Sequence, residues 1–181
     1  MRVVAGELRG RRLVMPAGAA TRPTADRVRE AVFSILGDVS GLRVLDLFAG
    51  SGALGIEALS RGAAELELVD RDRSAVAAIE RNLSDLGLEA RLHRRDVLRW
   101  LKAQPTGTAF GLVFCDPPYD AAVRLAAALA ERLPQILDRE ARIVTESHKR
   151  TPLELPFPLL RERAYGDTRI AVHRVADGED R

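Results

Sequence analysis

Short apolar runs and stretches with helical spacing alternate along most of this 181-residue chain. Apolar residues recur every three or four positions over 25–36, which predicts an amphipathic helix that Thr24 caps and Gly37 ends. From Leu42 onward, apolar runs typical of buried strands alternate with further helical stretches. The expected strands cover 44–48, 66–70, 90–93, 111–115 and 141–145, and the expected helices cover 53–61, 73–86, 97–102 and 121–133.

This alternation indicates an α/β fold, with a mostly parallel sheet covered by helices on both faces. Two further strands are expected at 159–165 and 168–174, with the hairpin signal Gly166-Asp167 between them. Because no helix separates these two strands, one of them must run antiparallel to the rest of the sheet.

The two ends of the chain differ from this pattern. Residues 2–5 and 12–15 look like short strands of a small N-terminal β-hairpin. We therefore expect a basic hairpin extension over 1–23, one main domain over 24–175 and a disordered tail over 176–181.

Composition supports a single globular domain, with 46% hydrophobic and 30% charged residues. No apolar run approaches the roughly 20 residues that a membrane helix needs. The N-terminal residues show no signal peptide, so we expect a cytoplasmic protein, and a monomer. A single cysteine, Cys115, excludes an internal disulfide framework and a zinc site built from cysteines, and we expect no metal.

Positive charge is concentrated near the N-terminus. Residues 1–36 hold seven arginines and three acidic residues, a net charge of +4, in a chain whose total is +2. A basic segment on a mildly acidic body suggests a polyanionic partner, although a merely solvated surface would look the same. The residues expected to contact a polyanion such as RNA are Arg9, Arg11, Arg12, Arg22, Thr24 and Arg27.

A glycine-rich loop follows the strand expected at 44–48. Gly50, Gly52 and Gly55 form the pattern GxGxxG between a strand and a helix, which lets a ligand approach the backbone. Asp70 lies 20 residues after Gly50, at the end of the next strand, where a carboxylate can accept from both hydroxyls of a ribose. This pattern alone indicates an adenosine-bearing cofactor and would also suit NAD.

Two acidic residues favour S-adenosylmethionine over NAD. Asp46 lies in the strand beside the glycine loop, where it would repel a pyrophosphate but attract the ammonium of a methionine. Asp96 follows the third strand and is placed to accept from an adenine amine, while the backbone N–H of Val97 would meet a ring nitrogen. The alternative for Asp96 is a helix N-cap.

The tetrapeptide Asp116-Pro117-Pro118-Tyr119 follows the fourth strand. An exocyclic amine of a nucleobase is a poor nucleophile because its lone pair is delocalised into the ring. The Asp116 carboxylate and the Pro117 carbonyl can accept its two N–H groups and direct that lone pair, and the prolines stiffen the turn. Tyr119 offers a flat face for stacking of a flipped base, worth ~1–3 kcal/mol. This sequence predicts methyl transfer to an exocyclic amine.

The chain resembles the bacterial methyltransferases that modify guanine N2 in small-subunit ribosomal RNA. The resemblance is carried by AGELRGRRL (5–13), RPTADRVREAVFSIL (22–36), LDLFAGSGALGIEALSRGA (45–63), VDRD (69–72) and LVFCDPPY (112–119). It implies a Rossmann-like class I methyltransferase fold with seven strands, S-adenosylmethionine as cofactor, and a guanine in 16S rRNA of the small ribosomal subunit as substrate.

The resemblance also implies roles for individual residues. The target base would be held by Asp116, Pro117 and Tyr119. The cofactor would be bound by Asp46, Phe48, Gly50, Gly52, Asp70, Arg71, Asp96 and Val97. Arg22 and Thr24 match a segment whose role we infer only as an active-site or RNA contact.

Other functions remain open from the residues alone. The same turn serves adenine-N6 and cytosine-N4 methyltransferases that act on DNA or RNA, although a chain of 181 residues leaves little room for the target-recognition domain that such DNA enzymes usually carry. Glutamine methyltransferases normally begin this turn with Asn. A cofactor-binding or RNA-binding module without catalytic activity is the non-enzymatic alternative, and the intact Asp116 and Tyr119 speak against it.

Overall fold

The computed structural model of the chain describes residues 1–18, 24–118 and 121–175. Its helices are α1 (Thr24–Leu36), α2 (Ala53–Ser60), α3 (Arg73–Leu86), α4 (Val97–Lys102), α5 (Ala122–Arg132) and a 3-10 turn (Leu133–Gln135). Its strands are β1 (Arg43–Leu47), β2 (Glu65–Asp70), β3 (Arg91–Arg94), β4 (Phe110–Cys115), β5 (Leu137–His148), β6 (Leu159–Tyr165) and β7 (Thr168–Arg174). No helix within the described ranges is long and apolar enough to cross a membrane.

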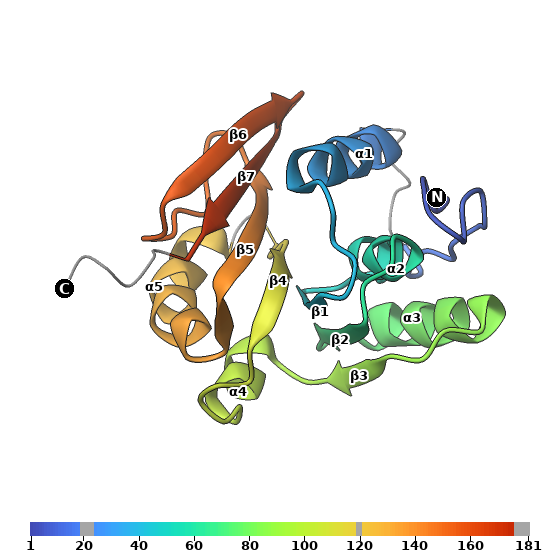
Figure 1. Cartoon of the computed structure of the whole chain (residues 1–181), viewed down its shortest axis with the longest axis horizontal. Coiled ribbons are helices and arrows are strands. Elements are labelled where there is room, and N and C mark those ends of the chain that lie inside the picture. Colours follow the sequence, from blue (N-terminus) through green and yellow to red (C-terminus); the bar gives the residue numbers. More distant parts are fainter. Residues whose placement is uncertain (19–23, 119–120, 176–181) are drawn as a thin grey trace.

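The strands form one seven-stranded sheet in the order β3-β2-β1-β4-β5-β7-β6 (Figure 1). β1 pairs in parallel with both β2 and β4, whereas β7 runs antiparallel to both β5 and β6. The expected antiparallel strand is confirmed and is β7. The order of the strands reverses between β1 and β4, and open α/β sheets bind ligands beyond the carboxyl ends of the strands at such a point.

The two faces of the sheet carry separate apolar clusters because neighbouring residues of a strand point to opposite faces. One cluster contains Val44 of β1 and Phe114 of β4, and it packs against α1, α2 and α3. The other contains Leu45 and Val113 of the same strands, and it packs against α4 and α5. We call the face of the sheet that carries the first cluster the α1 face. Side chains at the carboxyl ends of the strands that point to this face can reach the site described below.

The N-terminal segment folds back on itself, but it does not form the expected strands 2–5 and 12–15. The antiparallel arrangement is reduced to a single bridge between Arg2 and Arg12. The reason is that the backbone N–H groups of residues 4 and 5 donate to the Glu57 carboxylate of α2, at 2.7 and 2.9 Å. The N–H of Val14 donates to the side chain of Asn82 on α3. These groups bond to helices instead of to a partner strand.

Glu57 is a fully buried anion that joins the N-terminal segment to α1 and α2. Besides the two N–H groups, it accepts from Arg29 Nε at 3.3 Å and from Arg61 Nε at 2.9 Å. Arg29 also donates to Asp26 and to the carbonyl of Arg2. A buried carboxylate is tolerated when it is paired and hydrogen-bonded in this way, so the network fixes α1 against α2.

β5 is longer than the apolar pattern of 141–145 predicts. At its start, Leu137 pairs with Phe110, and the polar residues 138–140 that follow are exposed, which hides the strand from a search for apolar runs. At its end, His148 pairs with Thr168 of β7. The extension brings the carboxyl end of β5 level with the turn between β6 and β7.

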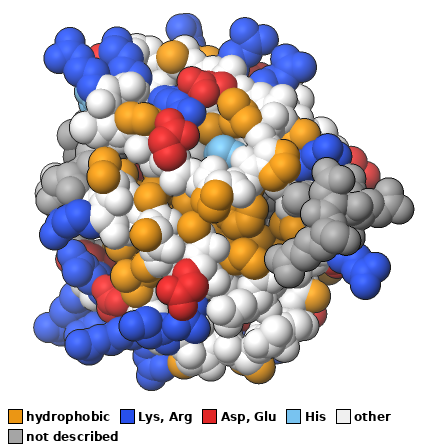
Figure 2. All heavy atoms as spheres, turned by 90° about the vertical axis from the view of Figure 1, so that its left-hand side faces the viewer, with side chains coloured by type: hydrophobic (Ala, Val, Ile, Leu, Met, Phe, Trp, Pro, Cys, Tyr) orange, Lys and Arg blue, Asp and Glu red, His pale blue; other side chains and the backbone are white. Residues whose placement is uncertain are grey.

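The outer face beside α5 and β6 is largely apolar at its centre. Figure 2 shows hydrophobic side chains gathered in the middle of this view and Lys and Arg mainly near its margin. On these elements Val123, Leu159 and Leu160 are exposed large apolar residues. The centre of this face therefore offers few contacts to a phosphate backbone.

Candidate active site

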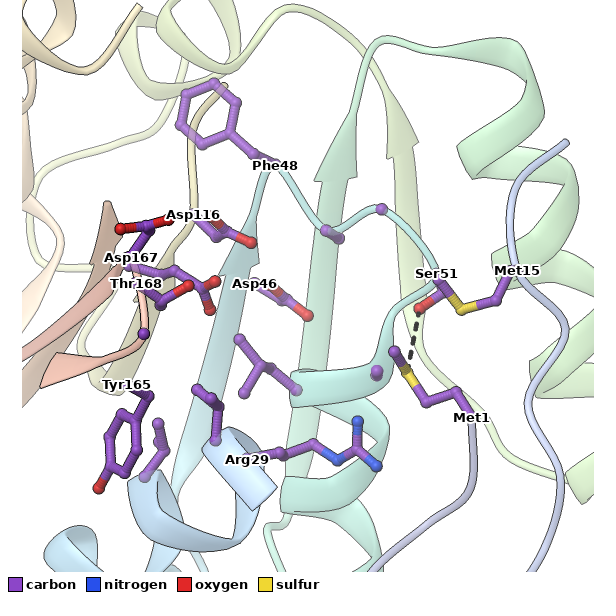
Figure 3. A pocket seen from close by; sticks show the side chains of 18 residues that line it. Met1, Met15, Arg29, Asp46, Phe48, Ser51, Asp116, Tyr165, Asp167 and Thr168 are labelled. Carbon is purple, nitrogen blue, oxygen red and sulfur yellow. Dashed lines mark hydrogen bonds between the residues drawn. The ribbon is translucent and has the colours of Figure 1, made fainter. Parts of the chain in front are cut away.

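A cleft of about 420 Å³ opens beyond the carboxyl ends of β1, β4 and β5. Its walls come from the glycine loop, α1, the N-terminal segment and the β6–β7 turn (Figure 3). The lining residues are Met1, Met15, Val28, Arg29, Val32, Asp46, Phe48, Ala49, Gly50, Ser51, Ala53, Leu54, Asp116, Glu146, Tyr165, Gly166, Asp167 and Thr168. The cleft therefore lies at the position that the reversal of strand order predicts.

Alternate residues of the glycine loop adopt the left-handed backbone conformation, and the Asp70 side chain stabilises the loop. Phe48, Gly50 and Gly52 have φ values of 60°, 58° and 75°. Asp70 accepts from the Gly50 N–H at 2.9 Å through one oxygen and from the Asp72 N–H at 2.8 Å through the other. The carboxylate that the sequence assigns to a ribose is thus held at the end of β2 by backbone donors, and each oxygen keeps further acceptor capacity.

The glycines of the loop have different roles. A Cβ at Gly50 would meet open space, which fits a position where a ligand approaches the backbone. A Cβ at Gly52 would lie 3.0 Å from Leu68 Cδ2, and one at Gly55 would lie 2.6 Å from Leu66 Cδ1. Gly52 and Gly55 therefore permit α2 to pack closely on β2.

Asp46 is a nearly buried carboxyl group at the floor of the cleft, with 2% of its surface exposed. Its Oδ2 accepts from the Gly55 N–H at 3.0 Å. Burial, and secondarily the negative charge of Asp70, raise the pKa of Asp46 to about 8. A carboxyl group whose ionisation is opposed in this way is a favourable site for a cationic ligand group, because the cation would relieve the penalty.

The residues expected to bind the adenine end of the cofactor, Asp96 and Val97, are not among those that line the cleft. Asp96 accepts from the Arg99 N–H at 3.1 Å and caps α4, which is the alternative that the sequence left open. The N–H of Arg95 donates to the carbonyl of Asp70, so the β3–α4 loop adjoins the end of β2. Val97 has a buried side chain and Arg71 is exposed. These residues flank the site without lining its deepest part.

Asp116 and Pro117 continue directly from β4 into the cleft region. Asp116 lines the cleft and is partly exposed, Pro117 is buried, and the carbonyl of Pro118 accepts from the Ala121 N–H before α5. Tyr119 lies outside the described residues. Burial raises the pKa of the Cys115 thiol, so this neighbour of Asp116 is an apolar packing residue rather than a nucleophile.

The arginines expected to contact RNA fall in two places. Arg11 donates to the carbonyl of Asp85 at the C-terminal end of α3, and Leu8 beside Arg9 bonds to Ser60 at the C-terminal end of α2. Because α2 begins at the cleft and α3 begins just after the carboxyl end of β2, Arg9 and Arg11 lie at the opposite end of these helices, while Arg12 forms a β-bridge with Arg2. Arg27 is exposed on α1, next to the cleft residue Val28. Arg22 lies outside the described residues, as does the side chain of Thr24.

Several residues of the cleft have no counterpart in the sequence-based prediction. The β6–β7 turn brings Tyr165, Asp167 and Thr168 to the rim opposite the glycine loop (Figure 3). Glu146 comes from β5, and Met1 and Met15 come from the N-terminal segment. The motif Gly166-Asp167 marks the turn, but its position against the cleft depends on the strand order β4-β5-β7, which no local pattern reveals.

Comparisons with known proteins agree with this geometry. A family model described as "Conserved hypothetical protein 95" matches residues 1–174. The chain is 41% identical to YlbH of Bacillus subtilis (strain 168) over 96% of this chain and 98% of that protein. It is 34% identical to Ribosomal RNA small subunit methyltransferase D of Haemophilus influenzae over 92% of this chain and 89% of that protein. The solved structure of a hypothetical protein of Thermus thermophilus, TTHA0928, superimposes with a TM-score of 0.80 at 34% identity, covering 97% of this chain and 99% of that one.

Proposed function

We propose that the chain, which belongs to the Conserved hypothetical protein 95 family, is an S-adenosylmethionine-dependent methyltransferase of ribosomal RNA. Its similarity to a small-subunit rRNA methyltransferase over 92% of its length supports this proposal. The observation that carries the proposal is the meeting of Asp46, the glycine loop and Asp116 in one cleft. Asp46 and Asp116 both line this cleft (Figure 3).

The glycine-loop side of the cleft fits S-adenosylmethionine. Asp46 offers a buried carboxyl group to the methionine ammonium, Gly50 leaves room for a ligand, and Asp70 accepts from the ribose hydroxyls. Phe48, Gly52, Arg71, Asp96 and Val97 complete this proposed site. The bound cofactor supplies an electrophilic methyl group on a sulfonium.

The DPPY side of the cleft would hold the target amine. The Asp116 carboxylate accepts one N–H of the amine and the Pro117 carbonyl accepts the other, which directs the nitrogen lone pair toward the methyl group. Tyr119 stacks on the base. Transfer is then an in-line displacement whose rate depends mainly on positioning, so it needs neither a metal nor a covalent nucleophile.

The finer proposal is that the amine is N2 of a guanine in 16S rRNA of the small ribosomal subunit. The basic residues Arg9, Arg11, Arg12, Arg22 and Arg27, together with Thr24, would contact the RNA around that guanine. A ribosomal substrate implies a cytoplasmic enzyme, and a cleft formed within one chain is consistent with a monomer.

Methyl transfer from radiolabelled S-adenosylmethionine tests the proposal. Small ribosomal subunits, naked rRNA, DNA and protein are offered in parallel, and the product nucleoside is identified by mass spectrometry. We expect label in small-subunit RNA as N2-methylguanosine. Label in adenine, in DNA or in protein would assign the site to one of the competing amine substrates, and the absence of label in every arm would favour a binding module.

A further inference from the structure

Guanine differs from the other amine-bearing bases in the atom beside its amine. In guanine the ring nitrogen N1 carries a hydrogen and donates, whereas N1 of adenine and N3 of cytosine are acceptors. A flipped base is read by hydrogen bonds to this Watson–Crick edge. A carboxylate beside the amine would therefore attract guanine and repel adenine and cytosine.

The strand register puts a second carboxylate beside Asp116. Cys115 of β4 pairs with Thr145 of β5, so Asp116 and Glu146, which follow these residues, are level on adjacent strands. Neighbouring strands lie about 4.8 Å apart. Phe114 and Val144, two positions earlier, both belong to the cluster on the α1 face, so the alternation of side chains directs Asp116 and Glu146 to that same face.

The charge of the cleft favours a base edge rich in hydrogen-bond donors. Besides Asp46, whose pKa is raised to about 8, its lining includes three carboxyl groups: Asp116, Glu146 and Asp167. Among the described lining residues Arg29 has the one cationic side chain, and it is already bonded to Asp26 and Glu57. Phosphate groups would be repelled here, whereas N–H donors of a base would be stabilised.

Glu146 is better placed for this contact than Asp167. The Asp167 side chain is 72% exposed at the rim and forms an ion pair with Lys149 at 2.9 Å. A hydrogen bond from Lys149 lowers the pKa of Asp167, and the exposed position leaves this carboxylate in water, where a hydrogen bond to a base is weaker. Glu146 is only partly exposed and lines a small recess together with Asp116 and the apolar residues Val32, Val144 and Ile170. Hydrogen bonds are electrostatically stronger in such surroundings than in water.

We propose that Glu146 is the specificity-determining residue of this site, which accepts a hydrogen bond from guanine N1–H while Asp116 accepts from the adjacent amine. This proposal rests on the proposed function, because it assumes that the amine enters beside Asp116. It adds a contact that rejects bases with an acceptor at the N1 position.

Replacing guanine by 2-aminopurine tests this contact, because 2-aminopurine keeps the amine at position 2 but has an acceptor at N1. The methylated position is first mapped with the wild-type enzyme. Small subunits are then reconstituted with either base at that position, and kcat/KM is measured for both with the wild type, Glu146→Gln and the matched control Asp167→Asn. The ratio of the two constants is taken within one enzyme preparation, so a smaller folded fraction cancels.

The wild type is expected to prefer guanine by about 10- to 100-fold, the discrimination typical of a well-formed contact to a base edge. In Glu146→Gln the amide N–H can donate to the N1 acceptor, so the preference should fall at least tenfold, whereas Asp167→Asn should keep the wild-type ratio. A wild-type ratio in Glu146→Gln would overturn the proposal. If Glu146→Gln does not fold, the same two constants are measured with Glu146→Asp. Its shorter side chain should lower the preference for guanine over 2-aminopurine, and an unchanged preference would again refute the role of Glu146. Failure of the proposed function is seen separately, as wild-type methylation of something other than a guanine.

Discussion

The two sides of the cleft are built in different ways. On the glycine-loop side, which comprises residues 46–55 and the adjoining Asp70, Asp46 accepts from a backbone N–H of α2, and Asp70 accepts from backbone N–H groups of Gly50 and Asp72. On the hairpin side, the side chains come from the end of β4 (Asp116), from β5 (Glu146) and from the turn between β6 and β7 (165–168), which are far apart in the sequence. Local backbone geometry can therefore specify the first side, whereas only the sheet assembles the second.

This difference has a functional meaning under the proposed activity. A cofactor is the same molecule in every turnover, so a site preorganised by backbone donors suits it. The substrate base must be discriminated from similar bases, and side chains on separate elements can be adjusted independently of the cofactor site. The following substitutions separate the two sides by their effects on turnover and on cofactor affinity.

The largest effect is expected from Asp116→Ala, which should lower kcat by about 100-fold or more because the amine loses the acceptor that positions it. Cofactor affinity should stay close to that of the wild type, since Asp116 acts on the other ligand. Single-turnover methylation of small subunits and calorimetry with S-adenosylmethionine measure the two quantities. Turnover close to the wild type would contradict the role given to Asp116.

Asp70→Ala should weaken S-adenosylmethionine binding by ~1–3 kcal/mol, because two ribose hydroxyls lose a charged acceptor. Asp72→Ala is a matched control two residues away. Asp72 caps α3 by accepting from the N–H groups of Ser74 and Ala75, so its loss should lower stability but leave affinity unchanged. Calorimetry on both variants checks the difference, and equal losses of affinity would remove Asp70 from the ribose site.

Asp46→Asn should lower cofactor affinity by about 10-fold, since an amide keeps the bond to Gly55 but loses the charge that faces the ammonium. The same variant should stabilise the cofactor-free protein increasingly as the pH rises. With a pKa of about 8, folded Asp46 keeps a proton that the unfolded chain releases near pH 4, so its contribution to the free energy of unfolding falls across that interval.

Thermal unfolding of the cofactor-free wild type and Asp46→Asn between pH 5 and 8 measures this effect. The melting temperature of the variant should exceed that of the wild type by a margin that widens with pH. A margin independent of pH would show that Asp46 is ionised in the free protein.

The smallest effect on either side of the cleft is expected from changing Arg9, Arg11 and Arg12 together to Ala. Arg9 and Arg11 lie near the C-terminal ends of α2 and α3, and none of the three arginines lines the cleft, so kcat and cofactor affinity should not change. If they capture RNA, each lost phosphate contact should reduce the salt slope of small-subunit binding by roughly one. Arg27→Ala, next to the cleft, is the comparison variant. Wild-type binding of the triple variant at every salt concentration would leave RNA capture to α1 and the cleft rim.

Local sequence predicted the class of fold, most of the helices and strands, and the candidate residues on the glycine-loop side of the site. Apolar periodicity located the helices and strands, because burial on one face requires a period of 2 or about 3.6 residues. Gly50, Gly52 and Asp70 were recognised because a loop between a strand and a helix has a fixed geometry over a short stretch of chain. Asp116 was recognised in the same way, from its own tetrapeptide.

Only the tertiary structure decided the rest. Glu146 lies within a long strand with no motif around it, and it reaches the cleft because β5 lies next to β4 in the sheet. The two strands expected in the N-terminal segment do not form, because Glu57, more than fifty residues away, accepts hydrogen bonds from the backbone of that segment. The raised pKa of Asp46 is likewise a consequence of burial, which depends on everything packed above it. Periodicity and motifs are properties of neighbours in the sequence, whereas cleft charge, backbone pairing and burial arise between residues that folding alone brings together.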